Sequence, residues 1–511
     1  MIAPFDSALF LSMLALIAAV IVVSALLSGM IERSGFPQVA VFLGLGAVIG
    51  PAGLNLLNAD LNSPILRVVA NLSLVLVLFT DAVSINLTEV RHHRLLSALV
   101  LGPGTLFSAL LIAALAWWWL GLNPAVAVIL GAALASTDPV LLRGLLRRPD
   151  VPPGVRQALR LEGGMNDAVL LPIILIGMTI LSQGRALTGK EWAQLGLNIL
   201  ILSPAAGAVI GLAAVGMLEL VRKRIGVRRD YESIYSLGVA FAAFAAAESV
   251  HGSGFLAAFA AGLTISAVDV ELCDCFLEYG ETTAEMALMF AFVLFGTSLI
   301  WTGLSIVGLG TLLFVGAVFA ARFLAFIPTL LPAPLSWRHR LLIAWFGPRG
   351  LSSLLLVSLP VFAGLPGTQG LLTMCCLVVL CSVFLHGLSP MALIRNQPGL
   401  PEAPVSTSIP TEPSSTVRES LAAEPVRDTA SATPSSEPVA LGDPEYITID
   451  EVQEFQRRSV PVVIADSRSE RTYNESTEEI PGAIRLHPER AIQSAAQNRI
   501  PKDHVLAVLC A

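Results

Sequence analysis

Ionisable, amide and hydroxyl side chains occur together inside segments of this chain that are otherwise apolar. One segment carries Ser136-Thr137-Asp138-Pro139, and the next carries Glu162-Gly163-Gly164-Met165-Asn166-Asp167. A charge in the middle of a bilayer costs roughly 3 kcal/mol on insertion scales, so such residues face a cavity, pair with one another and carry function. A carboxylate with carbonyl and water ligands suits small hard cations such as sodium or lithium. These two segments are therefore the first candidates for an ion-binding site.

Helical spacing places the polar groups of the second segment on two adjacent faces. Gly163 and Asp167 are four residues apart and share one face, while Glu162 and Asn166 form a second pair about 100° further round. Asp167 can then offer a carboxylate to a cavity, and Asn166 can hold unwound backbone near Thr137. Glycine at position 163 either leaves one ligand position to water or backbone or, together with Gly164, permits close helix packing.

Glu162 requires a cation if it is buried, and two later segments supply candidates. Arg322 lies inside one apolar segment, and Gly347-Pro348-Arg349-Gly350 interrupts the next. We expect Glu162 to pair with Arg349, because the interruption places that arginine near the crossing point. Asp81, near the end of an earlier apolar segment, is either a further site residue or only a helix-end carboxylate.

The composition shows which elements must position these groups. The 511 residues are 55% hydrophobic and only 14% charged, which excludes an ordinary soluble globular domain. A window of about 19 residues finds about thirteen apolar segments of spanning length between residues 10 and 388. The sequence therefore predicts an all-α polytopic membrane protein. Residues 10–29 lack a basic leader region and a cleavage site, so we expect a retained helix there rather than a signal peptide.

Two of the predicted helices are interrupted. Pro139 breaks one, and the Gly347-Pro348-Arg349-Gly350 stretch breaks another that lies seven segments later, so the two run in opposite directions. Prolines and glycines are common in membrane helices, but charge beside both breaks favours function. The pattern predicts inverted repeats whose two discontinuous helices cross at a site in the middle of the membrane.

Basic residues gather in alternate loops between the predicted spans. Arginine and lysine are concentrated around residues 91–94, 143–156, 222–229 and 338–340, and the intervening loops hold little beyond Arg185 and Lys190. By the positive-inside rule, the N-terminus lies outside and the C-terminal tail lies in the cytoplasm. The acidic loop at residues 270–285 departs from this pattern.

At the polar motifs the sequence resembles a known family. The motifs Thr137-Asp138-Pro139, Glu162-x-x-x-Asn166-Asp167 and Gly347-x-Arg349-Gly350, in that order, are similar to those of the sodium/proton exchangers of the monovalent cation:proton antiporter superfamily, in its Asn-Asp branch. The resemblance covers roughly residues 10–395. It implies a homodimer, a core domain with two crossed unwound helices, and alternating access.

The resemblance also implies roles for individual residues. Asp167 would carry the proton and the cation, and the backbone carbonyl of Thr137 would complete a sodium site. Asn166 and Asp138 would organise the crossing, and Glu162 would pair with Arg349. Many relatives have serine where this chain has Gly163, so this chain lacks a hydroxyl ligand at that position.

The C-terminal region differs in composition from the membrane part. Residues 396–443 are rich in Pro, Ser, Thr, Ala and Glu, which predicts a disordered linker after a transmembrane domain at residues 1–395. Residues 444–511 return to globular patterning and resemble the start of an α/β rhodanese-like domain, through Ile464-Ala-Asp466-Ser-Arg468, Tyr473, Ile480-Pro-Gly-Ala483 and the strand that ends at Cys510. In that family this cysteine is the nucleophile. Because the loop after Cys510 is absent, we expect no sulfurtransfer. The chain is then either a fragment, which we favour, or carries a regulatory remnant.

The residues and the resemblance together predict a secondary antiporter, not an enzyme, of the inner membrane. It would exchange sodium, or lithium or potassium, for protons one for one and electroneutrally, with a role in pH and sodium homeostasis. Its expected partners are the transported ions, the lipid bilayer and a second copy of the chain, with no cofactor and no nucleic acid. The alternatives are a channel or uniporter on the same bundle, and a membrane-anchored sulfur-relay protein.

Overall fold

The computed structural model describes most of the membrane part of the chain and a small portion of the C-terminal region. The described residues are 18, 21–22, 26, 38–57, 59–61, 63–85, 87–146, 151–225, 229–268, 281–394, 457, 461–467, 483–486 and 505–509. The chain forms two compact units, Met1–Ala403 and Pro404–Ala511. The predicted linker at residues 396–443 and the predicted nucleophile Cys510 lie outside the described residues.

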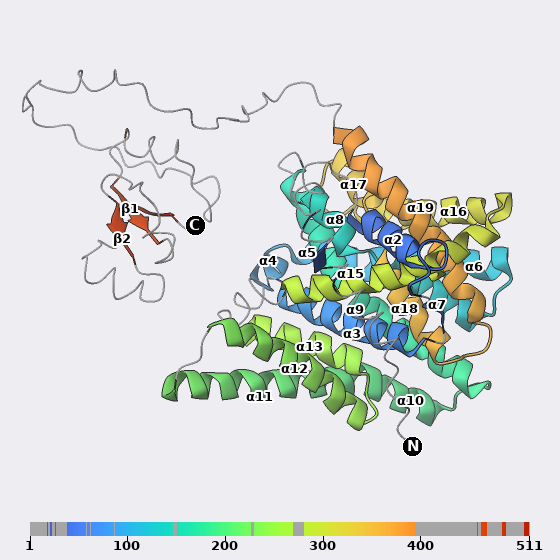
Figure 1. The fold of residues 1–511 in the computed structure, drawn as a ribbon, viewed down its shortest axis with the longest axis horizontal. Helices are drawn as coiled ribbons and strands as arrows, with labels where there is room; N and C mark the ends of the chain where they lie inside the picture. Colours follow the sequence, from blue (N-terminus) through green and yellow to red (C-terminus); the bar gives the residue numbers. More distant parts are fainter. Residues whose placement is uncertain are drawn as a thin grey trace, which may run out of the picture. The chain divides into compact units, whose positions relative to one another are not determined.

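Helices are the only regular secondary structure among the described residues of the first unit (Figure 1). In chain order its elements are α2 (Gln38–Ile49), α3 (Pro64–Val83), α4 (Leu87–His92), α5 (Arg94–Leu99), the π-helix η1 (Val100–Gly104), α6 (Thr105–Leu120), α7 (Pro124–Ala135), α8 (Pro139–Leu146), α9 (Pro153–Gln183), α10 (Gly189–Leu197), the π-helix η2 (Asn198–Leu202), α11 (Ser203–Arg224), α12 (Arg229–Ser249), α13 (Gly254–Val268), α15 (Glu281–Thr297), the 3-10 helix η4 (Leu299–Ile306), α16 (Leu309–Thr329), α17 (Trp337–Trp345), α18 (Leu351–Phe362) and α19 (Gln369–Ile394).

Length and apolar composition suit many of these helices to a bilayer. Among the described residues, seven helical stretches are long and apolar enough to cross a membrane, or eight if the bent pair α15–η4 is one span. Shorter apolar helices, including α2, α13 and α18, complete the bundle. The predicted span at residues 10–29 falls almost wholly outside the described residues, so the count of about thirteen stays a prediction.

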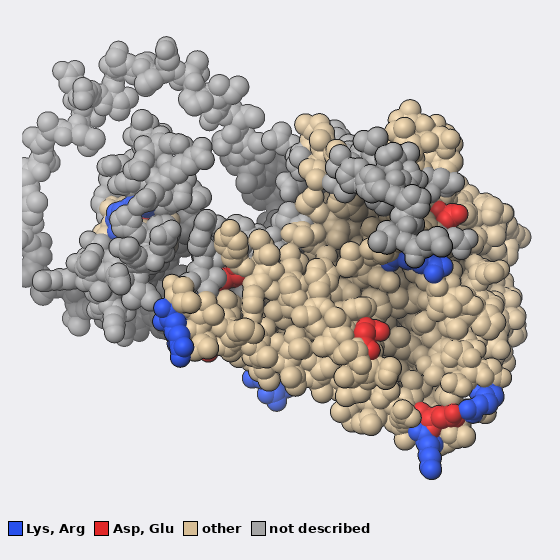
Figure 2. Space-filling model, turned by 60° about the horizontal axis from the view of Figure 1, so that its bottom comes forward, with Lys and Arg blue, Asp and Glu red and all other residues tan. Residues whose placement is uncertain are grey.

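The outer surface of the bundle has the character expected of a lipid-facing surface. Figure 2 shows a face on which most of the described surface carries no charged side chain, with lysine, arginine, aspartate and glutamate confined to a few places. Large apolar side chains point outward, among them Leu110, which is 63% exposed, and Leu324, which is 67% exposed. Such a surface is stable against hydrocarbon but not against water.

Small residues allow the helices on one side of the bundle to pack closely. α11, α12 and α13 lie side by side along this side, and α13 also packs against α3 (Figure 1). A Cβ atom at Gly207 of α11 would collide with the backbone of Ala257, and one at Gly262 would come within 2.6 Å of the Phe79 carbonyl oxygen. Small residues at such contacts let membrane helices approach along their backbones.

Both predicted interruptions are present, and each has a local cause. α7 begins after Asn123, whose side chain caps the first turn, and it ends at Ala135 because Ser136 is extended. α8 then restarts at Pro139, since proline suits the first helical position, where its missing N–H is not required. In the same way, residues 346–350 separate α17 from α18. The chain therefore places two short segments of unwound backbone inside the bundle.

The second unit contains a small parallel sheet. Its described strands are β1 (Val462–Asp466), β2 (Ile484–Arg485) and β3 (Val505–Leu509), in the order β2-β1-β3. Ala465 pairs with Ile484 on one side and with Val508 on the other. A strand, β1, is thus present within the region that resembles a rhodanese-like domain, and the resemblance itself stays a prediction.

Candidate functional site

One carboxylate joins the two interruptions. The backbone N–H of Asp138 donates to the Pro348 carbonyl at 2.9 Å, so the two unwound segments touch. Asp138 Oδ1 accepts the N–H of Val140 at 2.8 Å at the start of α8, and Oδ2 accepts the N–H of Leu351 at 2.6 Å at the start of α18. A carboxylate is stabilised at a helix N-terminus by free N–H groups and by the helix dipole. Asp138 therefore caps both half-helices that begin at the crossing.

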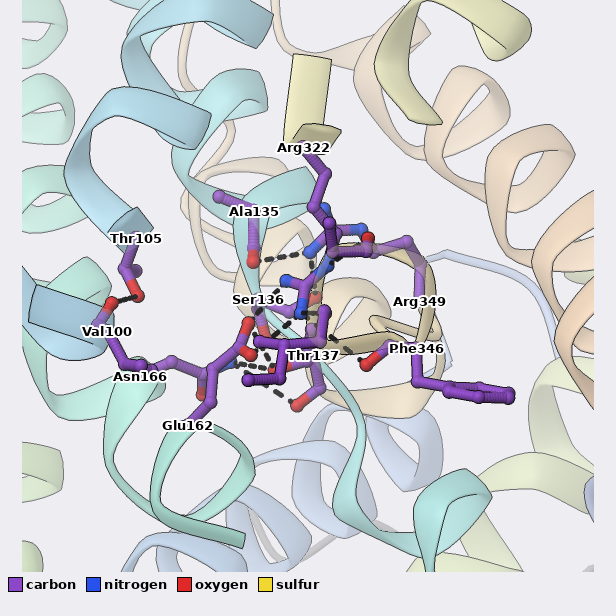
Figure 3. Close-up of polar contacts among 12 residues, drawn as sticks. Val100, Thr105, Ala135, Ser136, Thr137, Glu162, Asn166, Arg322, Phe346 and Arg349 are labelled. Atoms are coloured by element: carbon purple, nitrogen blue, oxygen red, sulfur yellow. Dashed lines mark hydrogen bonds and ion pairs between the residues drawn. The ribbon is translucent and has the colours of Figure 1, made fainter. Parts of the chain in front are cut away.

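Two arginines cap the half-helices that end at the crossing (Figure 3). Nη1 of Arg349 donates to the carbonyl oxygens of Ala135 and, at 3.0 Å, of Ser136, which close the C-terminus of α7. Nε of Arg322 donates at 3.0 Å to the Ala344 carbonyl near the C-terminus of α17. Cations are favoured at helix C-termini because the last carbonyl groups carry partial negative charge. The partial charges of all four half-helix ends at the crossing are thus balanced by charged side chains of opposite sign.

Glu162 forms a bidentate ion pair with Arg322 rather than with Arg349. Oε1 of Glu162 pairs with Nη1 of Arg322, and Oε2 accepts from Nη2 at 2.7 Å. The expected pairing with Arg349 is wrong, because the Arg349 guanidinium is directed at the carbonyls that end α7. Arg322 also lies over the Phe326 ring, with Cζ 4.2 Å from its centroid. Both partners are buried, at 3% and 2% exposure of their side chains, so the pair fixes α16 to α9.

Thr137 and Asn166 join the unwound segment to α9. Asn166 Nδ2 donates to Thr137 Oγ1 at 2.5 Å, and Thr137 Oγ1 donates to Glu162 Oε1 at 3.4 Å. Asn166 Oδ1 is buried and has no hydrogen-bond partner within the described part of the chain. Asn166 Nδ2 also lies 3.5 Å from the Thr137 carbonyl oxygen, so Asn166 is bonded to the unwound segment, and its role in organising the crossing stays a prediction.

Asp167 lies beside the crossing, and only one of its two carboxylate oxygens accepts a hydrogen bond from the described residues. It is 2% exposed, and Ser136 Oγ donates to Oδ1 at 2.5 Å. Ser352, in the first turn of α18, is a further polar neighbour of this carboxylate. Oδ2 is buried and makes no hydrogen bond to any residue that the structure describes. An acidic oxygen in this position can bind a proton or a cation without first breaking an ion pair.

The structure places the remaining predicted residues as follows. A Cβ atom at Gly163 would lie 3.4 Å from Pro139 Cβ and 3.7 Å from Leu142 Cδ1, so this position faces the start of α8. Asp81 is half-buried in the last turn of α3, which ends at Val83. The roles of Gly163 and Asp81 in ion binding stay predictions.

Two serines and two glycines contribute to the site although the sequence assigned no individual role to them. Ser136 was visible only as part of a motif, and Ser352 follows the second interruption without a distinctive pattern. The glycines of that interruption have a steric role: a Cβ at Gly347 would collide with the Arg322 guanidinium, and one at Gly350 with the Asp138 carboxylate. The sequence signal that could have identified these two glycines is their position beside a charged residue in an interrupted helix.

An all-helical membrane bundle whose interrupted helices meet beside a buried carboxylate has the architecture of a secondary transporter. The family model described as "Sodium/hydrogen exchanger, transmembrane" matches residues 18–395, and the chain belongs to this family. It is accordingly a multi-pass membrane protein.

Known relatives agree with this assignment. The K(+)/H(+) antiporter NhaP2 of Shewanella sp. (strain MR-4) is 29% identical over 385 residues, which are 73% of this chain and 64% of the relative. The K(+)/H(+) antiporter NhaP of Alkalimonas amylolytica is 25% identical over 71% of this chain and 63% of the relative. The chain thus spans less than two thirds of these two relatives. The Na(+)/H(+) antiporter NhaP of Pseudomonas aeruginosa is 27% identical over 62% of this chain and 78% of that protein.

A solved structure shows the same fold. The sodium proton antiporter MjNhaP1 from Methanocaldococcus jannaschii at pH 8 aligns with a TM-score of 0.63 at 19% identity, over 76% of this chain and 99% of that one. The named relatives are cation/proton antiporters, which are transporters and not enzymes.

Proposed function

We propose that the chain is a secondary antiporter that exchanges a monovalent cation for protons at Asp167. The observation that carries this proposal is the buried Oδ2 of Asp167, which makes no hydrogen bond within the described residues. The other carboxylates of the crossing are occupied, because Asp138 caps two helices and Glu162 pairs with Arg322. Asp167 is therefore the carboxylate best able to exchange one bound ion for another.

Competition for one carboxylate leads to exchange. A proton and a cation need the same oxygen atoms of Asp167, so each displaces the other. If either occupied form crosses the membrane but the empty, charged form does not, one cation moves for each proton and the cycle is electroneutral. The other charged side chains of the crossing do not alter the net charge moved in a cycle, because they stay paired with helix ends and with one another.

The ligands near Asp167 are oxygens, which suit sodium, lithium or potassium. Asn166 Oδ1 and Asp167 Oδ2 are both buried without a hydrogen-bond partner in the described part of the chain. We place the cation at Asp167 with the backbone carbonyl of Thr137, and water in the position that Gly163 leaves open. The curated relatives are named for potassium and for sodium, so both ions belong in the test.

Alternating access would move the crossing as one body. Capping bonds and the Glu162–Arg322 pair link α7, α8, α9, α16, α17 and α18. The layer of α11, α12 and α13 lies beside this group and packs against α3. We propose that the linked group moves against this layer in a homodimer of the inner membrane, with the N-terminus outside and the C-terminal tail in the cytoplasm.

Flux through purified protein tests the proposal. Proteoliposomes with an internal pH dye would be challenged in turn with sodium, lithium and potassium gradients, with Asp167→Asn protein as the matched control. We expect saturable, cation-driven proton movement. Because the exchange is electroneutral, this movement should need no potassium or proton ionophore to balance charge. Cation flux that moves no protons would instead identify a channel or uniporter, and equal exchange by the Asp167→Asn protein would contradict the role of Asp167.

A further inference from the structure

α19 presents two polar side chains to the interruption between α17 and α18. Ser382 and His386 are four residues apart and so lie on one face of the helix. Ser382 is fully buried and His386 is 7% exposed. Polar groups buried in a membrane helix usually make hydrogen bonds, and these two contact both ends of the interruption.

The contacts form a continuous chain. The backbone N–H of Arg349 donates to Ser382 Oγ at 2.6 Å. Ser382 Oγ lies 3.1 Å from His386 Nδ1, and His386 Nε2 lies 3.0 Å from the Trp345 carbonyl oxygen. Trp345 is the last residue of α17, and Arg349 lies two residues before α18. One turn of α19 therefore holds both sides of the interruption.

The directions of these hydrogen bonds follow from the donors available. A backbone N–H only donates, so Ser382 Oγ accepts from Arg349 and its own hydrogen is free for His386 Nδ1. Nδ1 then accepts, which places the proton of a neutral imidazole on Nε2, where it donates to the Trp345 carbonyl. The opposite tautomer would donate from Nδ1 to the Ser382 carbonyl, 3.2 Å away, and leave Nε2 facing the Trp345 carbonyl without a hydrogen.

The position of the Arg349 guanidinium depends on these contacts of its backbone more than it would if the guanidinium were held in an ion pair. Its side chain is fully buried, and its Nε and Nη2 have no hydrogen-bond partner among the described residues. Only Nη1 is bonded, to the carbonyls at the end of α7. With so few side-chain bonds, the position of the guanidinium is set largely by the backbone to which it is attached.

The chain of contacts continues to the proposed carrier. Arg349 Nη1 donates to the Ser136 carbonyl at 3.0 Å, and the hydroxyl of Ser136 donates to Asp167 Oδ1 at 2.5 Å. A shift of the backbone at Arg349 would thus change the position of Ser136 and, through it, the carboxylate. The described hydrogen bonds and ring contacts of His386 join it to Ser382, Trp345 and Phe319 and not to Asp167, so its effect on the carboxylate is indirect.

We propose that His386 is a positioning residue for the ion site: in its Nε2–H form it fixes the interruption between α17 and α18 and thereby sets Arg349 and Ser136. This inference rests on the proposed antiport for its transport measurements, and on the contacts alone for its structural measurement. Phe319 and Trp345 pack their rings against His386, with centroids 5.5 and 5.7 Å away, and keep its plane in place.

Two substitutions separate the nitrogens of the ring. His386→Gln can place an amide N–H near the position of Nε2 and keep the bond to the Trp345 carbonyl. His386→Asn reaches only the position of Nδ1 and leaves that carbonyl without a donor. Ser382→Ala removes the acceptor for the Arg349 N–H. Ser389→Ala is the matched control, because Ser389 lies on the same helix but bonds to the Trp345 indole at 3.1 Å and to the His386 carbonyl at 3.5 Å, and not to the Trp345 carbonyl or the Arg349 N–H.

Transport by the full chain in proteoliposomes gives the first readout. We expect His386→Asn and Ser382→Ala to raise the Michaelis constant for the cation by about threefold to tenfold, the effect of losing about one hydrogen bond. His386→Gln and Ser389→Ala should stay near the unsubstituted protein. If His386→Asn and His386→Gln instead lower the maximal rate and the melting temperature equally at an unchanged Michaelis constant, His386 only fills space and the inference fails.

Hydrogen–deuterium exchange gives a readout that does not require transport. The Arg349 amide should exchange faster in Ser382→Ala and His386→Asn protein than in the unsubstituted chain, while Ser389→Ala leaves it unchanged. An Arg349 amide that stays equally protected in both variants would overturn the inference. Absence of exchange activity in the unsubstituted protein would contradict the proposed antiport and leave this measurement to decide the role of His386.

Discussion

Glu162 and Arg322 are 160 positions apart in the chain, yet they form a buried bidentate ion pair between α9 and α16. Arg322 also donates to the carbonyl oxygen of Ala344, so one guanidinium compensates both a carboxylate and the end of a half-helix. Arg349 is thereby free to cap α7. The two arginines divide the negative groups of the crossing between them and leave Asp167 without a cation.

Replacing Asp167 by asparagine should abolish exchange without unfolding the protein. The amide of Asn cannot accept and release a proton near neutral pH, although it has nearly the same shape and can still accept from Ser136. Cation-driven proton flux in proteoliposomes, with a thermal melt of the same sample in detergent, measures both outcomes. Robust flux from the well-folded Asp167→Asn protein would contradict the prediction.

Removing either member of the Glu162–Arg322 pair should destabilise the protein strongly. Each single substitution, Glu162→Gln or Arg322→Met, leaves one buried charge without its partner and should cost roughly 3 to 5 kcal/mol. The double variant should lose less than the sum. Melting curves of the single and double variants give the coupling energy. The matched control is a cycle between Glu162 and Arg349, for which we expect a smaller coupling; equal coupling in both cycles would argue against the pairing.

A methyl group at Gly350 should disrupt the crossing. Its Cβ would collide with the Asp138 carboxylate, which caps α18 through Leu351 N–H. We expect Gly350→Ala to lower the melting temperature and to reduce transport together. Gly316→Ala on α16 is the control, because no atom lies within 4 Å of its Cβ position, and removing a helix-interior glycine should stabilise by about 0.5 to 1 kcal/mol. Unchanged stability of Gly350→Ala would count against the capping role of Asp138.

Serine at position 163 should strengthen cation binding. Position 163 lies one helical turn before Asp167, and the new Cβ would make ordinary contact with Pro139 at 3.4 Å. The added hydroxyl could replace a water ligand, which should lower the Michaelis constant for sodium severalfold at little cost in stability. A lower melting temperature without a gain in affinity would show that glycine serves helix packing at this position.

Deleting the chain after Arg395 should leave basal exchange intact. The crossing, the ion pair and Asp167 all belong to the first compact unit, Met1–Ala403. The second unit contributes a separate parallel sheet. Flux measured side by side for the truncated and the full chain tests this division. A truncated protein that inserts normally but transports nothing would show that the C-terminal region is required.

Local sequence was sufficient for the class of protein and for the parts of the site. Apolar length predicts membrane helices, because a bilayer excludes unpaired backbone groups and most charges. Proline and glycine beside charged residues predicted the two interruptions. The helical spacing placed Asn166 on a polar face, from which it could reach the unwound backbone near Thr137, and the two residues share a hydrogen bond. These are local effects, decided by the backbone of one helix or by the cost of placing a single residue in lipid.

Tertiary structure decided which charges pair. Arg322 and Arg349 have the same charge and both lie in apolar segments, so nothing in the sequence separates them as partners of Glu162. Asp138 caps α18 across 213 residues of chain, and His386 meets Trp345 across 41. Such contacts depend on how helices cross and on which way each side chain points at the crossing. Because those directions arise only when the bundle packs, the ion pair, the shared cap and the open oxygen of Asp167 emerged from the fold.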